Sequence, residues 1–275
     1  MHVRPEQFRI PVVLVAALAT LLLAACDPST STNVPSNVGP RYTRPPSSAT
    51  STWQYQLQGT IDETVAATVF DIDGFDTPAS TVARLKSKGK YPICYISTSF
   101  ENWRPDARSF PASVLGNNLD GWPGERWIDI REIEALAPIF IARIEMCKAK
   151  GFQAVEFDNV DAHTQDTGFR ISAADQLLFS KGLAAVAHSR GLAAGLKNNA
   201  EQAAELQPHY DFAIVEECVA WNECGAYSSF TRAGKPVFVV EYERTPTQTC
   251  RTTDPLGFAG IVKTYDLTAT PWTAC

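Results

Sequence analysis

The sequence predicts an α/β protein of the (β/α)8 class, a TIM barrel in a single domain. Short apolar, β-like runs alternate with helical segments along the chain, a pattern typical of parallel βα units. Eight candidate strands occur in about 220 residues, near the lower end of the usual barrel size. No GxGxxG or GxxxxGK[ST] motif follows the first strand, which disfavours the alternative, a doubly wound open sheet.

The expected strands are residues 68–71, 91–97, 126–130, 153–157, 192–196, 211–215, 236–241 and 257–262. Between them, apolar residues recur at three- and four-residue spacing, which predicts helices over 77–88, 132–150 and 172–190. Ser172 and Asp175 have the spacing of a helix N-cap. Glycines follow the three helices at the position where helices commonly end, namely Gly89, Gly151 and Gly191.

Residues 1–25 resemble a bacterial lipoprotein signal peptide. Arg4 and Arg9 precede an apolar stretch over 10–25 that is short for a membrane span, so an uncleaved anchor is the less favoured interpretation. The stretch ends in Leu-Ala-Ala-Cys, which resembles a lipobox with Cys26 as the lipidated residue. We therefore expect an exported protein, attached to a membrane through Cys26 on its periplasmic or cell-surface side.

A linker is expected over residues 26–52, followed by one folded domain over 53–275. Of the 26 residues from 27 to 52, eleven are Ser or Thr and five are Pro, a composition that cannot bury a core. The first 52 residues hold four of the 24 basic and two of the 30 acidic residues, which leaves the domain with 20 and 28 and a net charge of −8. This charge excludes nucleic acid as a natural partner and suits a polycationic one.

Six cysteines remain after Cys26, and an even number in an exported domain predicts disulfides. Six cysteines allow fifteen connectivities, between which the sequence does not choose. We favour Cys218 with Cys224, Cys250 with Cys275, and Cys94 with Cys147. A zinc site is the alternative, but the chain has no CxxC pair and its few histidines do not flank the cysteines, so we expect no metal.

Acidic residues dominate the carboxyl ends of the predicted strands, where barrels carry their functional groups. A single acid there could be a helix cap, but acids at six of eight ends would converge on one rim and raise one another's pKa values. The polar residues at these ends include Asp71, Asp73, Asp129, Glu156, Asp158, Asp161, Lys197, Asn198, Glu216, Glu217, Glu241, Glu243, Lys263 and Asp266.

Aromatic residues lie near the same loops and could stack on sugar rings, although most aromatic side chains serve as core. They are Trp53, Tyr55, Tyr95, Trp103, Trp122, Trp127, Trp221 and Tyr242. Other chemistries have less support. The chain lacks a GxSxG elbow, and the segment from Asp158 to His163 matches no zinc or calcium template, so no cofactor is expected.

Several ordered motifs resemble glycoside hydrolase family 114, the endo-α-1,4-polygalactosaminidases, and the resemblance covers essentially all of residues 53–265. The motifs are Trp53-Gln54-Tyr55-Gln56-Leu57, Phe70-Asp71-Ile72-Asp73, Ile93-Cys94-Tyr95-Ile96-Ser97, Asn102-Trp103-Arg104-Pro105-Asp106, Gly121-Trp122-Pro123-Gly124-Glu125, Val155-Glu156-Phe157-Asp158-Asn159-Val160-Asp161 and Glu216-Glu217-Cys218. The resemblance implies a (β/α)8 hydrolase with two catalytic carboxylates.

The family's aspartate in Glu-x-Asp-Asn corresponds to Asp158, and its glutamate in Glu-x-Cys corresponds to Glu216. Strand parity places Glu156 and Asp158 on one face but does not decide between Glu216 and Glu217. The family often has Asn-Glu-Gln-Cys where this chain has Val-Glu-Glu-Cys, so a second carboxylate adjoins the expected one. The motif favours Glu216.

The resemblance implies retaining hydrolysis of an α-1,4-linked galactosamine polymer, with Asp158 as nucleophile and Glu216 as acid and base. The expected partner is a cationic exopolysaccharide, and the protein is expected to be a monomer. Two alternatives stay open: a non-catalytic, surface-anchored glycan-binding lipoprotein, and a hydrolase of another α-linked glycan. The residues expected to contact substrate are Asp71, Asp73, Tyr95, Trp127, Asn159, Asp161, Lys197, Asn198 and Glu241.

Overall fold

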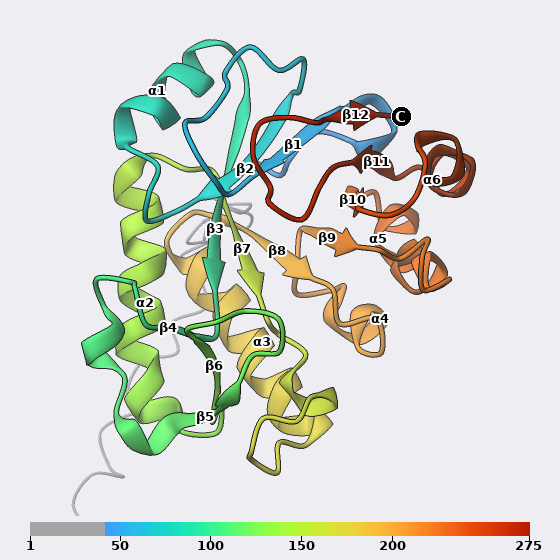
Figure 1. Ribbon diagram of the computed structural model, residues 1–275. Coiled ribbons are helices and arrows are strands. Elements are labelled where there is room, and N and C mark those ends of the chain that lie inside the picture. Colours follow the sequence, from blue (N-terminus) through green and yellow to red (C-terminus); the bar gives the residue numbers. More distant parts are fainter. Residues whose placement is uncertain (1–41) are drawn as a thin grey trace, which may run out of the picture. The chain divides into compact units, whose positions relative to one another are not determined.

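The computed structural model describes residues 42–275, and the predicted signal peptide and Cys26 lie outside them. Eight parallel strands form a barrel-like sheet (Figure 1). Its strands, in spatial order, are β1 (Trp53–Gln56), β2 (Val69–Asp73), β3 (Tyr91–Ser97), β7 (Ala154–Asp158), β8 (Ala193–Lys197), β9 (Phe212–Glu216), β10 (Val237–Glu241) and β11 (Ala259–Val262). The predicted TIM-barrel class is confirmed.

The barrel closes through tryptophan side chains. The described residues show no ladder between β1 and β11, and a short strand, β12 (Thr273–Ala274), pairs antiparallel with β11 instead. The indole of Trp53 donates to the carbonyl of Ala259 at 3.0 Å, and that of Trp272 donates to the carbonyl of Trp53 at 2.8 Å. Side-chain donors therefore replace backbone pairing at this seam.

Helices follow most of the barrel strands. They are α1 (Ala79–Ser87), α2 (Ile133–Lys150), α3 (Ala173–Ser189), α4 (Ala203–Leu206), α5 (Ser228–Arg232) and α6 (Pro246–Thr253). Short 3-10 turns cover Ser48–Thr50, Ala107–Ser109, Ala112–Val114, Ala162–Thr164, Cys224–Tyr227 and Asp254–Leu256. The predicted N-cap is present: Ser172 and Asp175 form a reciprocal capping box at the start of α3.

The predicted strand 126–130 is not a barrel strand, and this prediction was wrong in its placement. It corresponds to β6 (Glu125–Ile128), the centre of a separate antiparallel sheet with β4 (Phe100–Glu101) and β5 (Leu115–Asn118), in the connection from β3 to α2. The eighth barrel strand is β1 instead. Its Gln54 and Gln56 interrupt the apolar pattern, yet both are fully buried, because their amides donate to nearby backbone carbonyls.

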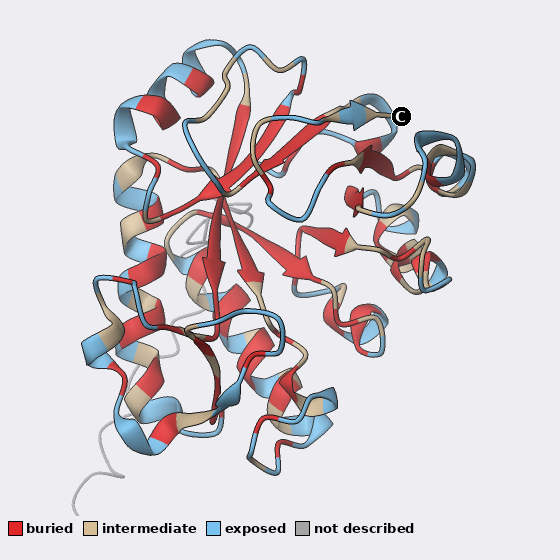
Figure 2. Ribbon diagram, in the orientation of Figure 1, coloured by how far each residue is buried: buried red, intermediate tan, exposed pale blue. Residues whose placement is uncertain are grey.

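The barrel interior has two parts, and Figure 2 shows its strands almost wholly buried. The lower interior, near the amino-terminal strand ends, is the apolar set Trp53, Val69, Ala154, Ala193, Phe212, Phe238 and Ala259. Gly195 belongs to this packing, because a Cβ there would lie 2.3 Å from the ring of Phe212. The upper interior, near the carboxyl ends, is the polar set Asp71, Glu156, Asp158, Lys197 and Glu216.

Part of the expected linker is folded. Arg44 pairs with Asp211 at 2.9 Å, and buried Ser48 donates to the carbonyl of Gly257 at 2.7 Å. Asp211 and Gly257 precede β9 and β11, so residues 42–52 pack across the amino-terminal end of the barrel. The Ser/Thr/Pro composition predicted an unfolded linker for these residues as well. That prediction failed because backbone and hydroxyl hydrogen bonds, rather than apolar burial, hold this segment in place.

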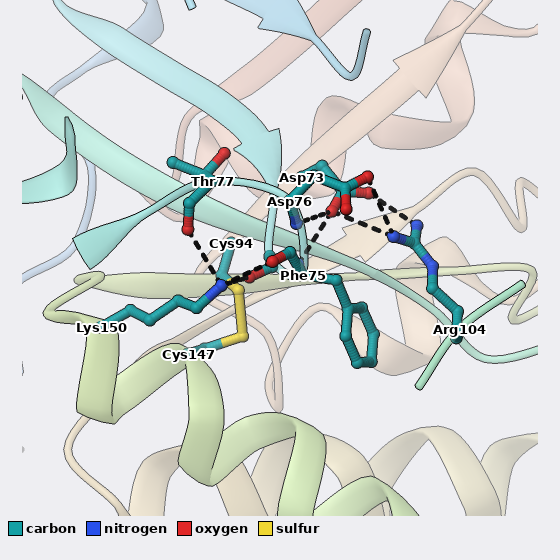
Figure 3. The surroundings of a disulfide bond; sticks show 9 residues. Asp73, Phe75, Asp76, Thr77, Cys94, Arg104, Cys147 and Lys150 are labelled. Atoms are coloured by element: carbon teal, nitrogen blue, oxygen red, sulfur yellow. Dashed lines mark hydrogen bonds and ion pairs between the residues drawn. A yellow bond between two sulfur atoms is a disulfide. The ribbon is translucent and has the colours of Figure 1, made fainter. Parts of the chain in front are cut away.

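The three favoured disulfides are present: Cys94–Cys147, Cys218–Cys224 and Cys250–Cys275. The first joins β3 to α2 beneath the loop that follows β2 (Figure 3). Gly74 of that loop passes so close that a Cβ would lie 2.5 Å from the sulfur of Cys94. Lys150 donates to the carbonyls of Gly74, Phe75 and Thr77 at 2.6–2.9 Å, which fixes the loop in place (Figure 3).

Candidate active site

A cavity of about 750 Å³ opens at the carboxyl ends of the strands. Ten carboxylate residues line it but only two cationic ones, Arg104 and Lys197. The acids are Asp73, Asp76, Glu101, Asp120, Glu125, Asp158, Asp161, Asp166, Glu216 and Asp266. Such a field attracts cations and repels anions. Among the described residues, no group of three His, Cys, Asp or Glu side chains is arranged to hold a metal ion.

Lys197 is the centre of the site. Its ammonium lies 3.1 Å from Asp158 Oδ1, 3.2 Å from Glu216 Oε2 and 3.2 Å from Glu156 Oε1, and the residue is 2% exposed. Burial alone would lower the pKa of Lys197, but the three carboxylates outweigh it and hold that pKa well above its usual value. Because both catalytic candidates contact one nitrogen, their nearest oxygens lie no farther apart than twice 3.2 Å.

Each candidate carboxylate also accepts a hydrogen bond from a tyrosine. Tyr95 Oη donates to Asp158 Oδ2 at 2.7 Å, and Tyr242 Oη donates to Glu216 Oε1. Burial, followed by the adjacent carboxylate charges, raises the pKa of both phenols well above the usual value, so they stay protonated donors. Asp158 and Glu216 therefore have matching surroundings: one lysine and one tyrosine each.

Two asparagines shape the turns behind the pair. Asn159 and Asn198 have φ of 62° and 47°, the left-handed region that asparagine tolerates better than most residues. The N–H of Asn159 donates to Asp158 Oδ1 at 2.9 Å, and Asn198 Oδ1 accepts from the N–H of Glu216 at 2.9 Å. These bonds hold both strand ends, and with them both carboxylates, in position.

The structure separates Glu216 from Glu217. Glu216 shares the inward face of β9 with Ile214, lines the cavity and contacts Lys197. Glu217 has φ of 56°, so the chain turns there and its side chain accepts from Tyr265 Oη at 2.8 Å, away from Lys197. Glu216 is the glutamate that faces Asp158 across the lysine.

Two further carboxyl groups lie beneath the pair, in the barrel interior. Burial raises the pKa of Glu156 to about 7, although Lys197 acts in the opposite direction. Burial and the Glu156 charge raise the pKa of Asp71 well above its ordinary range. Asp71 is therefore the protonated partner of this pair at neutral pH.

Most of the residues predicted to contact substrate line the cavity: Asp73, Tyr95, Trp127, Asn159, Asp161, Lys197 and Asn198. Asp71 and Glu241 do not line it. Asp71 is fully buried below the site. Glu241 follows inward-facing Val240 on β10, so its side chain points to the outward face of the strand. There its carboxylate accepts a hydrogen bond from the N–H of Val219 at 2.7 Å.

Asp73 is on the wall of the cavity rather than beside the central lysine. Arg104 donates to both of its oxygens, at 3.1 and 2.6 Å, and also pairs with Glu101 at 2.8 Å (Figure 3 shows the Asp73 pair). Phe75 lies under the guanidinium, with its ring centroid 4.8 Å away. Asp73 is thus already neutralised by the protein.

Sequence reasoning considered Tyr55 and Tyr242 only as rings that could stack on sugars, and it gave no role to Glu125 or Asp120. Tyr55 donates to Glu156 at 3.2 Å and accepts from Lys197 at 3.0 Å, and Tyr242 holds Glu216. Their inward parity on β1 and after β10 is the signal that could have found them. Glu125 and Asp120 come from the β3–α2 connection, for which strand parity carries no such signal.

A parallel barrel with two half-buried, hydrogen-bonded carboxylates facing one another in an open cavity defines the class of glycoside hydrolases that use paired acids. The comparison with known families agrees. The sequence model of glycoside-hydrolase family GH114 matches residues 32–275, and the chain belongs to that family. The protein is a glycoside hydrolase.

Solved structures and a sequence relative resemble it. The crystal structure of Aspergillus fumigatus Ega3 with galactosamine matches with a TM-score of 0.78 and 34% identity, over 84% of this chain and 96% of that one. The glycoside hydrolase domain of PelA from Pseudomonas aeruginosa shares the fold, with a TM-score of 0.62 and 14% identity over 81% and 97%. An uncharacterized protein of Deinococcus radiodurans is 27% identical over 277 residues, 82% of this chain and 87% of that protein.

Proposed function

We propose that this protein is an endo-acting hydrolase of α-1,4-linked, galactosamine-containing polysaccharide. The observation that carries the proposal is the acidic cavity, with ten carboxylates and two cations, around a carboxylate pair that shares Lys197. Amines of galactosamine are protonated at neutral pH and suit such a field. The similarity to Ega3, whose crystal structure contains galactosamine, supports the same substrate class.

The proposed mechanism is retaining. Asp158 attacks the anomeric carbon and forms a glycosyl ester, while Glu216 gives its proton to the departing glycosidic oxygen. Glu216 then takes a proton from the water that cleaves the ester. Retaining enzymes hold their carboxyl groups ~5 to 5.5 Å apart and inverting ones ~6.5 to 9.5 Å. The shared contacts with Lys197 hold Asp158 Oδ1 and Glu216 Oε2 within twice 3.2 Å of each other, a bound that the retaining separation satisfies.

Lys197 would balance charge in both steps. Before attack it stabilises the negative charge of Asp158, which it contacts at 3.1 Å. Once Asp158 is an ester and uncharged, the ammonium is left with Glu156 and Glu216, at 3.2 Å each. This favours the anionic form of Glu216, the form that must act as base toward water.

The remaining cavity residues are proposed substrate contacts. Tyr95 and Trp127 offer aromatic surface, and Asn159 and Asn198 offer amide groups to sugar hydroxyls. Asp161 is the acid of this set. Among residues 42–275 its carboxylate forms no ion pair, and it accepts a hydrogen bond from the side-chain amide of Gln165 at 3.0 Å.

We also propose that the protein is an exported lipoprotein that acts on exopolysaccharide from a membrane surface. The support is the lipobox-like sequence ending at Cys26 and the three disulfides of the domain. Disulfides persist in oxidising compartments outside the cytosol. Labelling with a radioactive fatty acid, in wild type and in Cys26→Ala, tests the anchor, and label retained in the variant would contradict it.

The function is tested by incubating the purified protein with α-1,4-linked galactosamine polymer, its N-acetylated form and a neutral galactan, with products read by mass spectrometry. Asp158→Asn and Glu216→Gln should each lose about 10³-fold or more in turnover, as expected when a nucleophile or acid is removed. Glu217→Gln is the matched control and should keep activity. Products with retained anomeric configuration by NMR support the ester mechanism.

Three outcomes would redirect the proposal. Bound polymer without any product would make the protein a surface-anchored glycan-binding lipoprotein. Cleavage of the neutral galactan alone would assign another α-linked glycan. Loss of activity in Glu217→Gln, with Glu216→Gln active, would exchange the two glutamates.

A further inference from the structure

Glu125 is a buried carboxylate that the proposed mechanism does not use. It lies on β6, is 6% exposed and lines the cavity. In the antiparallel pairing of β4 with β6 it stands directly opposite Glu101. Like charges at opposite positions of a sheet repel each other, so each needs a partner.

The two glutamates are partnered very differently. Glu101 has Arg104 at 2.8 Å and Arg143 at 3.5 Å. Glu125 has no cationic side chain within ion-pair distance among residues 42–275. One oxygen, Oε2, accepts from Ser99 Oγ at 2.8 Å, and within the same part of the chain Oε1 accepts no hydrogen bond. The protein neutralises Glu101 and leaves Glu125 open to the cavity.

A chain of hydrogen bonds fixes Glu125 relative to the catalytic pair. Asn159, next to Asp158, donates through Nδ2 to Ser97 Oγ at 2.9 Å, and Ser97 and Ser99 are joined through their hydroxyls at 2.7 Å. Because Ser99 gives its proton to Glu125, Ser97 must donate to Ser99. The chain ends in an acceptor, so an ionised Glu125 completes it.

The surroundings make an unpaired Glu125 costly. Burial raises its pKa to about 7, the charges of Glu101 and Asp158 act in the same direction, and the bond from Ser99 opposes them. A buried charge without a partner is unfavourable, and a cation delivered by a ligand removes that penalty. A neutral ligand cannot do so.

We propose that Glu125 is a specificity-determining residue, whose free oxygen binds the protonated amine of a galactosaminyl unit in the cavity. The proposal rests on the proposed function and deepens it: it assigns the preference for free amine over N-acetylated or neutral sugar to one carboxylate. Glu125 does not touch the reacting atoms, and its role is to select the substrate.

The test compares kcat/KM of the purified protein and of Glu125→Gln on the amine polymer and on the same polymer after N-acetylation. The amine preference should fall about ten- to a hundredfold, the usual effect of losing a bond to a charged group. The change should appear in KM for the amine polymer, with activity on the acetylated polymer unchanged or higher. Glu134→Gln, which removes an exposed carboxylate of α2, controls for net charge.

Equal losses on both polymers in Glu125→Gln would show a structural role and overturn the inference. A wild type that cleaves both polymers equally well would also overturn it, while leaving glycan hydrolysis intact. A wild type that cleaves neither would contradict the proposed function itself. If Glu125→Gln does not fold, Ser99→Ala serves instead: freeing the carboxylate should lower the amine preference several-fold, and an unchanged preference would contradict the proposal.

Discussion

The lower and upper parts of the barrel interior come from the same strands, yet apolar packing stabilises the lower part and buried ion pairs stabilise the upper part. Phe238 in the lower interior packs against Trp53 and Phe212 with no polar partner required. Two to four residues farther along the strands, Lys197 is equally buried and depends on three carboxylates. Apolar packing is non-directional and favourable, whereas buried ions cost several kcal/mol each unless fully paired.

This difference predicts what a substitution in each part of the interior should affect. Loss of a lower side chain should cost stability and spare the chemistry. Loss of an upper side chain should cost chemistry and, where it leaves a charge unpaired, stability as well. The predictions that follow test this contrast.

Lys197→Met should have the largest effect. It leaves Glu156, Asp158 and Glu216 without their shared cation, so turnover should fall about 10³-fold and stability by about 3–5 kcal/mol, as for a broken buried ion pair. Turnover is measured on the amine polymer and stability by urea unfolding. A variant that keeps both would show that the upper interior does not depend on its lysine.

Phe238→Ala should separate stability from chemistry. Removing a fully buried aromatic ring from the lower interior should lower the free energy of unfolding by about 3–5 kcal/mol. The concentration of folded protein is titrated with an active-site label, and kcat per folded molecule should stay close to the wild-type value. A large fall in its kcat would mean that the two parts are coupled.

Stability should fall as pH rises from about 5 to about 7. Because burial raises the folded-state pKa of Glu156 to about 7, the folded protein keeps a proton that the unfolded chain, with an ordinary carboxyl, releases between these values. The stabilisation is thus present at acid pH and lost through this window, on the order of 3 kcal/mol. Urea midpoints at several pH values measure it, and a slope unchanged in Glu156→Gln would argue against this source.

Tyr242→Phe should have the smallest effect. Loss of the phenol that donates to Glu216 should lower kcat/KM about five- to tenfold, or about 1 kcal/mol. The pH–rate profile should change on the limb that reports the acid, which a purely structural change would not move. Tyr227→Phe is the matched control, since its buried hydroxyl has no partner within residues 42–275.

Sequence reasoning succeeded where the pattern is local. Strand periodicity located seven of the barrel strands, and capping chemistry at Ser172 located the start of α3. It failed where long-range pairing decides. The run around Trp127 is a strand, but its pattern does not reveal that it joins a second sheet, and buried Gln54 and Gln56 made β1 look exposed.

The site divides in the same way. Inward parity brings Asp158 and Lys197 together, and it is visible in the sequence. The choice of Glu216 over Glu217 depends on the backbone turning at Glu217, with φ of 56°, which parity alone does not show. Glu125 reaches the cavity through a connection outside the barrel, so only the folded chain reveals it.

The docking of residues 42–52 has a geometric consequence for the whole enzyme. Arg44 and Ser48 are fastened to the amino-terminal end of the barrel, whereas the cavity opens at the carboxyl end. The chain thus enters the folded domain from the side opposite the cleft. A segment joined upstream of Arg44 would therefore attach at the end of the barrel away from the cavity, and a polymer would reach the cleft from the other end.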